Sequence, residues 1–509
     1  MKALEYKHAA TLENIIKVDD FSRFVDFIIK NSLNINSRFP AMQNRKISFA
    51  PIIAVAAYYK SFTIFSKLLQ KSVDIDFSKL KFLKVKPLLH YALAGGHAGI
   101  IELLLDNNCD LEYALIPCIK YGHLKLTQQF ALFVQNQSDV PFTSVLDEFF
   151  PETIGNNSDF AIKLAIRSQK MDMLDYIYNN LYSREDQEKE THLFFKNNKY
   201  RTALHYACHF DSFEVINYIL DKNPLQMLPS KENTITPLHL VFNSQIPTHS
   251  KVACPILDAI SECKLLSDKL PEILNSYDDE KMTILHYAAK YGLRDAVRML
   301  LDKFGSVINT KSQRNDGFTP MMLSVLSRDQ ETLKIFMEKT PHDAAITNNL
   351  GRNVLHIAAR QNFVKGFKLI YEIFPELLYQ IDLCQMSPLI AAAVERSFDV
   401  VDFIVDHDPE FVKIDKCAIS GRNVLHWLSK IGNAENIIQK IVERGLIDVN
   451  SLSKDPPVTP LFYAVKENRP ETVKILINYG ADPNLGKERF LKPSQIPCPI
   501  IIKELMKQN

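Results

Sequence analysis

The residues of this chain best suited to chemistry are six histidines that each directly follow a leucine, because imidazole can bind zinc or transfer a proton. They are His90, His205, His239, His286, His356 and His426. We call the position that these histidines occupy in the repeating pattern the slot. From His205 the slot recurs at steps of 34, 47, 36, 34, 34, 36, 36 and 33 residues, on His239, His286, Met322, His356, Ile390, His426, Phe462 and Gln495. A near-constant period in this range is typical of stacked repeats.

This spacing argues against a shared metal. A zinc–nitrogen bond is about 2 Å long, whereas equivalent positions on successive packed helices lie about 8 to 10 Å apart. We therefore expect no metal site. The chain also contains no phosphate loop, no His-Glu-x-x-His, no Gly-x-Ser-x-Gly and no dinucleotide fingerprint. The sequence predicts no catalytic residues, no cofactor and no enzymatic activity.

The residues around each slot predict two helices. Thr or Asn precedes the first helix as a cap, and Ala pairs such as Ala288 and Ala289 leave a flat face for close packing. Proline, whose missing N–H does no harm at the first helical position, opens four units at Pro237, Pro320, Pro388 and Pro460. The second helix carries an apolar stripe, as in Val215, Ile216, Ile219 and Leu220, or Val297, Leu300 and Leu301. Each unit can bury its stripe only against its neighbours.

The words around the slots resemble the ankyrin family. They read TALHYA at 202–207, TPLHL at 236–240, TILHYAA at 283–289 and NVLHIAA at 353–359. The unit near the carboxyl terminus runs TPLFYA at 459–464 and then ETVKILINYGADPN at 471–484. The resemblance implies an all-α ankyrin-repeat solenoid of stacked helix-turn-helix units, about twelve to fourteen in number. It also implies that each slot histidine is neutral and bonds the cap and adjacent backbone.

The repeats divide the chain into five segments. We expect a helical cap over 1–47, ankyrin repeats over 48–110, degenerate repeats over 111–195, repeats over 196–484, and a capping repeat over 485–509. Residues 159–165 are the expected first helix within the degenerate stretch. The 47-residue step contains three prolines and predicts an enlarged loop or extra helical turn, an insertion near 242–281.

Composition limits the possible partners. The chain has 509 residues and a net charge of +1, so its overall charge favours neither nucleic acid nor a membrane surface. No apolar run approaches the roughly 20 residues of a membrane span, and the amino terminus lacks the apolar stretch of a secretory signal. The eight cysteines show no regular spacing. Such a pattern predicts reduced thiols, largely in the core, in a cytoplasmic protein, and we expect a monomer.

Relatives of this family generally bind proteins on the concave face, through the turn tips and the exposed end of the first helix. The matching slots lie just before the cap and four to five residues after the histidine. They hold Arg201, His209, Phe210, Met282, Lys290, Tyr291, Phe318, Arg352, Arg360, Gln361, Arg422, Lys430, Ile431, Lys466 and Glu467.

Seven of these residues are Lys or Arg, opposed by Glu280, Glu395 and Glu467. The set predicts a protein-binding scaffold whose groove takes an acidic, partly apolar segment, with arginine binding carboxylates and aromatic rings acting as anchors. The competing interpretation is that exposed helix ends are often charged whatever they bind. Charge reversal at Arg352, Arg360 and Arg422 would distinguish the two.

The carboxyl terminus suggests another class of function. Residues 496–505 resemble the Leu-Pro-x-Pro segment of the SOCS box, which implies a substrate-recognition subunit of a cullin-type ubiquitin ligase. The upstream Leu-Cys-Arg element of that box is missing, and Gln495 falls where a terminal capping repeat should begin. The spacing favours the cap. A secreted ankyrin effector is a further alternative, whereas kinship with the ankyrin arms of ion channels is disfavoured because the chain has no pore helices.

Overall fold

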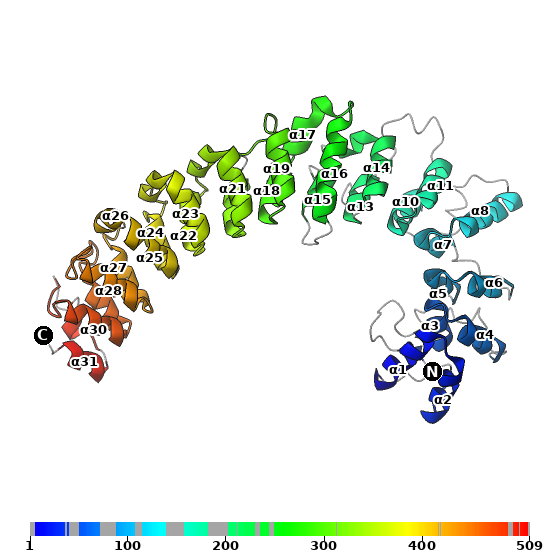
Figure 1. Ribbon diagram of the computed structural model, residues 1–509, viewed down its shortest axis with the longest axis horizontal. Helices are drawn as coiled ribbons and strands as arrows, with labels where there is room; N and C mark the ends of the chain where they lie inside the picture. The colour runs from blue at the N-terminus through cyan, green and yellow to red at the C-terminus, as the bar shows by residue number, and fades with distance from the viewer. Residues whose placement is uncertain are drawn as a thin grey trace. The chain divides into compact units, whose positions relative to one another are not determined.

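The repeating pattern of the sequence folds into helix pairs in the computed structural model of the chain (Figure 1). The structure describes residues 6–35, 38–39, 50–71, 88–106, 115–138, 157–181, 202–210, 212–229, 235–243, 249–311, 313–415, 417, 419–486, 492–497 and 499–506. Two compact units divide the chain, unit 1 over Met1–Gln226 and unit 2 over Met227–Asn509.

Unit 1 begins with a helical pair, α1 (Tyr6–Val18) and α2 (Phe21–Lys30), where the sequence predicts an amino-terminal cap. Its later first helices are α3 (Ile52–Tyr58), α5 (Leu88–Gly95), α7 (Leu115–Tyr121), α10 (Asn157–Ser168) and α13 (Ala203–His209). Its second helices are α4 (Phe62–Lys71), α6 (Ala98–Asp106), α8 (Leu124–Ser138), α11 (Met171–Leu181) and α14 (Phe213–Lys222). Successive first helices pack on one another from α3 to α13.

Three further features lie in unit 1 or at its boundary, and the first of them bears on a prediction. α10 contains residues 159–165, so the first helix expected in the degenerate stretch is confirmed. A two-residue antiparallel pairing joins β1 (Arg38–Phe39) to β2 (Ala50–Pro51), directly before α3. A short 3-10 helix, η3 (Pro224–Met227), lies at the boundary of the two units.

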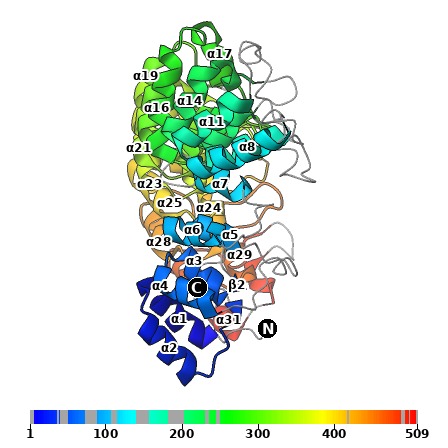
Figure 2. The same cartoon turned by 90° about the vertical axis from the view of Figure 1, so that its right-hand side faces the viewer.

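Unit 2 repeats the same arrangement. Its first helices are α15 (Pro237–Phe242), α18 (Ile284–Lys290), α20 (Pro320–Leu326), α22 (Val354–Arg360), α24 (Pro388–Val394), α27 (Val424–Ile431) and α29 (Pro460–Lys466). Its second helices are α16 (His249–Glu262), α19 (Arg294–Lys303), α21 (Gln330–Lys339), α23 (Val364–Ile373), α25 (Phe398–His407), α28 (Glu435–Glu443) and α30 (Pro470–Asn478). First helices pack on first and second on second, and Figure 2 shows α19, α21, α23, α25 and α28 along one side of the unit.

Short helices follow several of these second helices in unit 2. They are η4 (Ser267–Lys269), α17 (Leu270–Asn275), η5 (Pro341–Ala345), η6 (Pro375–Tyr379), α26 (Pro409–Ile414), η8 (Pro493–Gln495) and α31 (Ile500–Met506). The insertion predicted near 242–281 corresponds to the 14-residue α16, which has Pro255 inside it, followed by η4 and α17. The extra residues are therefore largely helical.

Caps start the first helices as the sequence predicts. The side-chain oxygens of Thr283, Thr319, Asn353, Ser387, Asn423 and Thr459 each accept from the backbone N–H three residues later. All six cap side chains are buried, and the predicted prolines occupy the first helical turn. Because a buried cap satisfies a helix-terminal donor without water, each repeat starts its first helix at a fixed residue.

The core lies between the helices of each repeat and its neighbours. The stripe residues Val215, Ile216, Ile219 and Leu220 of α14 and Val297, Leu300 and Leu301 of α19 are buried, which confirms the predicted second-helix faces. Ala288, Ala289, Ala358 and Ala359 are fully buried, as expected for small residues between closely packed first helices. Within the described part of the chain, no helix is both long and apolar enough to cross a membrane.

The cysteines only partly match the expectation of core thiols. Cys118, Cys208 and Cys417 are buried, Cys254 and Cys263 are half-buried, and Cys384 is exposed. Burial raises the pKa of the Cys118 thiol well above its usual range. The exposure of Cys384 follows from its place at the tip of a hairpin rather than in a helix. Cys109 and Cys498 lie outside the described residues.

Candidate protein-binding surface

A hairpin with a short tip precedes each first helix of unit 2 from α18 to α29. The residue that opens the hairpin donates its N–H to the carbonyl of the residue that closes it, at 2.9 to 3.1 Å, in Asp278–Met282, Arg314–Phe318, Asn348–Arg352, Asp382–Met386, Cys417–Arg422 and Ser453–Val458. In four hairpins the opening side chain also accepts from the closing N–H, at 2.8 to 3.1 Å, namely those of Asp278, Asn348, Asp382 and Ser453. A short acceptor side chain at this position fixes the turn.

Successive hairpins are joined by backbone hydrogen bonds, which we call the loop ladder. The donor and acceptor pairs are Asn315 N to Glu280 O at 2.9 Å, Asn349 N to Asp316 O at 3.2 Å, Leu383 N to Leu350 O at 2.9 Å, and Lys454 N to Ser420 O at 2.8 Å. Gly317 has φ of +84°, and a Cβ there would lie 2.4 Å from Asn349 N. Glycine therefore permits both the turn and the close approach of the next hairpin.

Gly317→Ala is expected to lower the free energy of unfolding of unit 2 by roughly 2 to 4 kcal/mol, because it adds a backbone clash to the strain of positive φ. Gly480→Ala is the matched control, since Gly480 has φ of +87° but a Cβ there would meet no described atom within 4 Å. That control should cost only about 1 kcal/mol. Urea unfolding followed by circular dichroism measures both, and equal losses would show that the loop ladder is not a close contact.

The slot histidines join each cap to the next hairpin. At Thr236 and Thr283 the cap N–H donates to Nδ1 of His239 and His286, at 3.0 and 3.2 Å. The opposite nitrogen, Nε2, lies 3.1 Å from a carbonyl oxygen of the next hairpin in four repeats, pairing His239 with Met282, His286 with Phe318, His356 with Met386, and His426 with Val458. Each ring thus holds two adjacent repeats in register.

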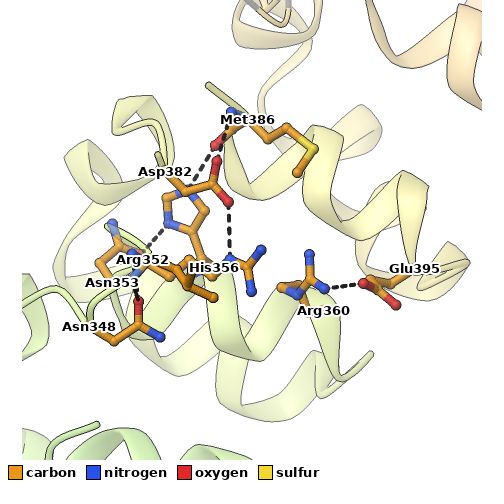
Figure 3. A network of polar contacts seen from close by, with 9 residues as sticks. Asn348, Arg352, Asn353, His356, Arg360, Asp382, Met386 and Glu395 are labelled. Atoms are coloured by element: carbon orange, nitrogen blue, oxygen red, sulfur yellow. Dashed lines mark hydrogen bonds and ion pairs between the residues drawn. The ribbon is translucent and has the colours of Figure 1, made fainter. Parts of the chain in front are cut away.

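Burial sets the protonation of these rings. Burial is the largest cause of the lowered pKa of His239 and of His356. It lowers the pKa of His239 below its usual range and the pKa of His356 to about 4. Figure 3 shows His356 between Asn353 of its own repeat and Met386 of the next. The contacts with the cap and the next hairpin agree with the expected structural role, and burial favours the neutral form of His239 and His356.

Two of the arginines predicted to bind a partner already bind carboxylates of this chain. Arg352 Nε lies 3.0 Å from Asp382 Oδ2, and the Asp382 side chain is 0% exposed, whereas that of Arg352 is 15% exposed (Figure 3). Arg360 pairs with Glu395, from the following repeat, and both of these side chains are partly exposed. The Arg352 charge already neutralises a buried aspartate of the adjacent hairpin, which argues against the predicted contact between Arg352 and a carboxylate of a partner.

The remaining predicted residues occupy different environments. Met282 is 1% exposed and cannot contact a partner through its side chain, because it closes a hairpin against the core. Phe318 is half-buried under the Arg314 guanidinium, and Tyr291 donates to Asn243 Oδ1 at 3.1 Å. The exposed members are His209, Lys290, Gln361, Lys466 and Glu467. Phe210 and Ile431 are half-buried, and Arg201 lies outside the described residues.

The structure brings some of the predicted cations together with aromatic rings. The Arg422 guanidinium lies 5.4 Å from the Trp427 ring and 5.1 Å from the Tyr463 ring, so it bridges α27 and α29. The Lys430 ammonium lies 5.4 Å from the same Trp427 ring, and that of Lys466 lies 5.9 Å from Phe462. We call this set the aromatic–cation cluster: Arg422, Trp427, Lys430, Phe462, Tyr463 and Lys466.

The cluster contains polar atoms without partners. Arg422 Nε and Trp427 Nε1 are both buried donors for which the described residues offer no acceptor. The structure also records no ion pair between a described carboxylate and Arg422, Lys430 or Lys466. A buried donor left unpaired is unfavourable by about 1 to 3 kcal/mol. Because both of these atoms are buried, the groups of the cluster that face solvent are the half-buried Lys430 and the exposed Lys466.

Exposed aliphatic side chains lie on the hairpin tips, a feature that the sequence reasoning missed. Leu350, Leu383 and Ile419 are 46%, 68% and 65% exposed, and they occupy three consecutive hairpins. The first two are adjacent through their backbone hydrogen bond in the loop ladder. Turns of this kind normally carry polar residues. The presence of three aliphatic residues in these turns is therefore the feature of the sequence that could have identified this surface. Trp427 and Tyr463 were also missed, although both directly follow the repeating slot.

Comparison with known proteins places this architecture in a family. The chain matches the family described as ankyrin repeats (3 copies) at residues 252–344 and 389–487, and the one described as ankyrin repeat at residues 199–225. Together these matches cover most of unit 2 and the last helix pair of unit 1.

Similar proteins carry the same repeats. An ankyrin repeat-containing protein of Schizosaccharomyces pombe is 31% identical over 117 residues, which are 22% of this chain and 48% of the relative. An ankyrin repeat protein of Acanthamoeba polyphaga mimivirus is 22% identical over 387 residues, 71% of this chain and 46% of the relative. The alignments thus span about half the length of these two relatives.

Among solved structures, the ankyrin repeat domain of Bcl-3 is 17% identical, with a TM-score of 0.40 over 45% of this chain and 100% of that domain. The period, the caps, the histidines joining adjacent repeats and the family matches agree with one another. The chain is an ankyrin-repeat protein.

Proposed function

We propose that this chain is a non-catalytic scaffold that binds an acidic, partly apolar segment of a partner protein on the hairpin and first-helix side of unit 2. The observation that carries the proposal is the aromatic–cation cluster. It places three cations, for which the structure records no ion pair with a described carboxylate, beside aromatic rings, in a repeat whose neighbouring tips expose aliphatic side chains. Among the other predicted cations, Arg352 and Arg360 already pair with carboxylates of this chain.

The chemistry of the cluster selects the partner. A carboxylate at the cluster would accept from the Lys430 and Lys466 ammonium groups, which lie beside the Trp427 and Phe462 rings and form charge-assisted hydrogen bonds. Tryptophan, tyrosine and arginine are also the residue types that dominate binding energy at interfaces. Leu350, Leu383 and Ile419 supply an apolar surface for the rest of the segment. The partner should therefore carry acidic residues interspersed with aliphatic ones.

Trp427 provides a direct test because it is the only tryptophan of the chain. A synthetic peptide of glutamate and leucine residues should change the tryptophan fluorescence of the full chain in a saturable way, and the same peptide with glutamine for glutamate should not. Raising the salt concentration should weaken binding, since the cluster lysines are exposed or half-buried. A glutamine peptide that binds as tightly would contradict the acidic-partner proposal.

Variants locate the binding. Lys430→Glu with Lys466→Glu should weaken the dissociation constant by about tenfold or more, as loss of charge-assisted contacts implies. The matched control is Lys365→Glu with Lys474→Glu, which makes the same charge change at exposed positions on the second helices α23 and α30. The control should bind like the natural chain, and equal weakening in both would mean that net charge rather than this surface governs binding.

The alternative role in a cullin-type ubiquitin ligase depends on the segment at 496–505. Ile496 packs against Val458, Phe462 and Tyr463, while α31 packs on α30 and Ile502 is fully buried. These contacts favour a capping role for residues 485–509, which is our proposal for this segment. The cytoplasmic location, the monomeric state and the secreted-effector alternative stay predictions.

A further inference from the structure

Unit 1 contains a pocket of about 220 Å³ formed by four successive first helices. Its lining includes Tyr58 of α3, His90 and Tyr91 of α5, Lys120 and Tyr121 of α7, and Arg167 of α10. Two of the lining residues, Lys120 and Arg167, are cations, and the other side chains are mainly aromatic. The pocket therefore combines aromatic walls with two positive charges.

The aromatic walls pack edge to face. The His90 and Tyr121 ring centroids lie 5.6 Å apart with planes at 81°, and the Tyr121 hydroxyl lies 3.4 Å from His90 Nε2. The Lys120 ammonium lies 5.1 Å from the Tyr121 ring centroid. Burial raises the pKa of Tyr121, and the nearby Arg167 charge opposes that rise, so guanidinium and hydroxyl act on each other. The cations and the tyrosine hydroxyl are thus gathered at one place.

Close backbone packing fixes the spacing of two of the walls. A Cβ at Gly95, the last residue of α5, would lie 2.4 Å from Ala57 O and 2.7 Å from Tyr58 O of α3. Only glycine allows the ends of these helices to approach so closely. Tyr58 and the α5 residues therefore keep a set separation, as a preformed binding site requires.

We propose that this pocket receives one oxyanion-bearing side chain of a partner, a carboxylate or a phosphate carried on a short apolar or aromatic stem. Pockets for whole small molecules typically enclose about 300 to 1,000 Å³, so the smaller volume here suits a single side chain. Lys120 and Arg167 would bind the oxyanion, and the tyrosine rings would pack on the stem. The site lies in unit 1 and is independent of the aromatic–cation cluster.

Small probes test the proposal on the full chain. Benzoate and phenyl phosphate carry the two possible oxyanions on an aromatic stem, and benzamide is the neutral analogue of benzoate. Saturation-transfer NMR should detect binding of at least one anion and no binding of benzamide. Tighter binding of benzoate would assign a carboxylate ligand, and tighter binding of phenyl phosphate a phosphorylated one. Binding of benzamide as tight as that of the anions, or binding of neither anion, would overturn the proposal.

Three variants locate the probe. Lys120→Gln with Arg167→Gln should weaken anion binding by about tenfold or more. The control is Lys30→Gln with Lys222→Gln, which makes the same charge change at exposed positions on α2 and α14 and should leave anion binding unchanged. Ala94 also lines the pocket, so Ala94→Leu fills the pocket while keeping both cations. It should abolish binding even if the charge variant folds poorly. Anion binding that survives Ala94→Leu, with unchanged circular dichroism, would contradict the pocket.

Discussion

Arg352→Glu is expected to lower the free energy of unfolding of unit 2 by about 3 to 5 kcal/mol, the usual effect of removing one partner from a buried ion pair. The reason is that Asp382 has a fully buried side chain, which would then face a second negative charge. Asp382 also accepts from the N–H of Met386 and so holds its hairpin together. Urea unfolding followed by circular dichroism measures the loss.

Arg360→Glu is the matched control for this prediction. Its partner Glu395 is 39% exposed and Arg360 itself 23% exposed, so water can solvate both charges after the reversal. Exposed pairs contribute about 1 kcal/mol or less, and the control should lose no more than that. Equal losses at the two sites would contradict the structural role assigned to Arg352. Because Arg352 supports the fold, the charge variants that test binding are better placed at Lys430 and Lys466.

His356→Ala is expected to lower the free energy of unfolding of unit 2 by about 3 kcal/mol at pH 7.5, because it leaves a cavity and removes the ring between two repeats. Burial lowers the pKa of His356 to about 4 in the folded chain, whereas an unfolded histidine titrates near 6.5. Between these values the unfolded state binds more protons, so the natural chain loses stability as the pH falls through this window.

The pH dependence distinguishes this effect from simple loss of packing. Since the variant lacks the titrating ring, the difference between the two chains should shrink by roughly 2 kcal/mol at pH 5. His342→Ala is the control, because His342 is exposed, and it should change stability by less than about 0.5 kcal/mol. Urea unfolding at pH 7.5 and pH 5 provides both comparisons. A difference that stays constant with pH would mean that His356 is not buried as a neutral ring.

The sequence predicted the fold well because its signals are local. Caps such as Thr283 and Asn353, prolines at the first helical position and apolar stripes each act within one or two helical turns. The repeating slot then placed these elements in register, and the resemblance supplied the role of the histidines. The same signals could not show that the chain divides after Gln226, because compact units arise from the sum of contacts between helices.

The candidate surface was only partly predictable, since its properties depend on contacts between repeats. The position of a residue in the repeat predicts whether its side chain is exposed, but Met282 is buried. Arg352 pairs with Asp382, which lies 30 residues away in the chain. The stacking of Arg422 between Trp427 and Tyr463 likewise joins two repeats. Sequence spacing identified Arg422 and Lys430 as candidates, but only the structure shows which cations lack a carboxylate within the described part of the chain.

Affinity purification of the intact chain with mass spectrometry tests most directly whether the aromatic–cation cluster of unit 2 binds a partner protein, as we propose. Three chains should be compared: the natural one, Lys430→Glu with Lys466→Glu, and Lys365→Glu with Lys474→Glu. We expect at least one protein with acidic, aliphatic-rich segments to be retained by the first and third and lost from the second. Identical sets of retained proteins for all three chains would contradict the claim.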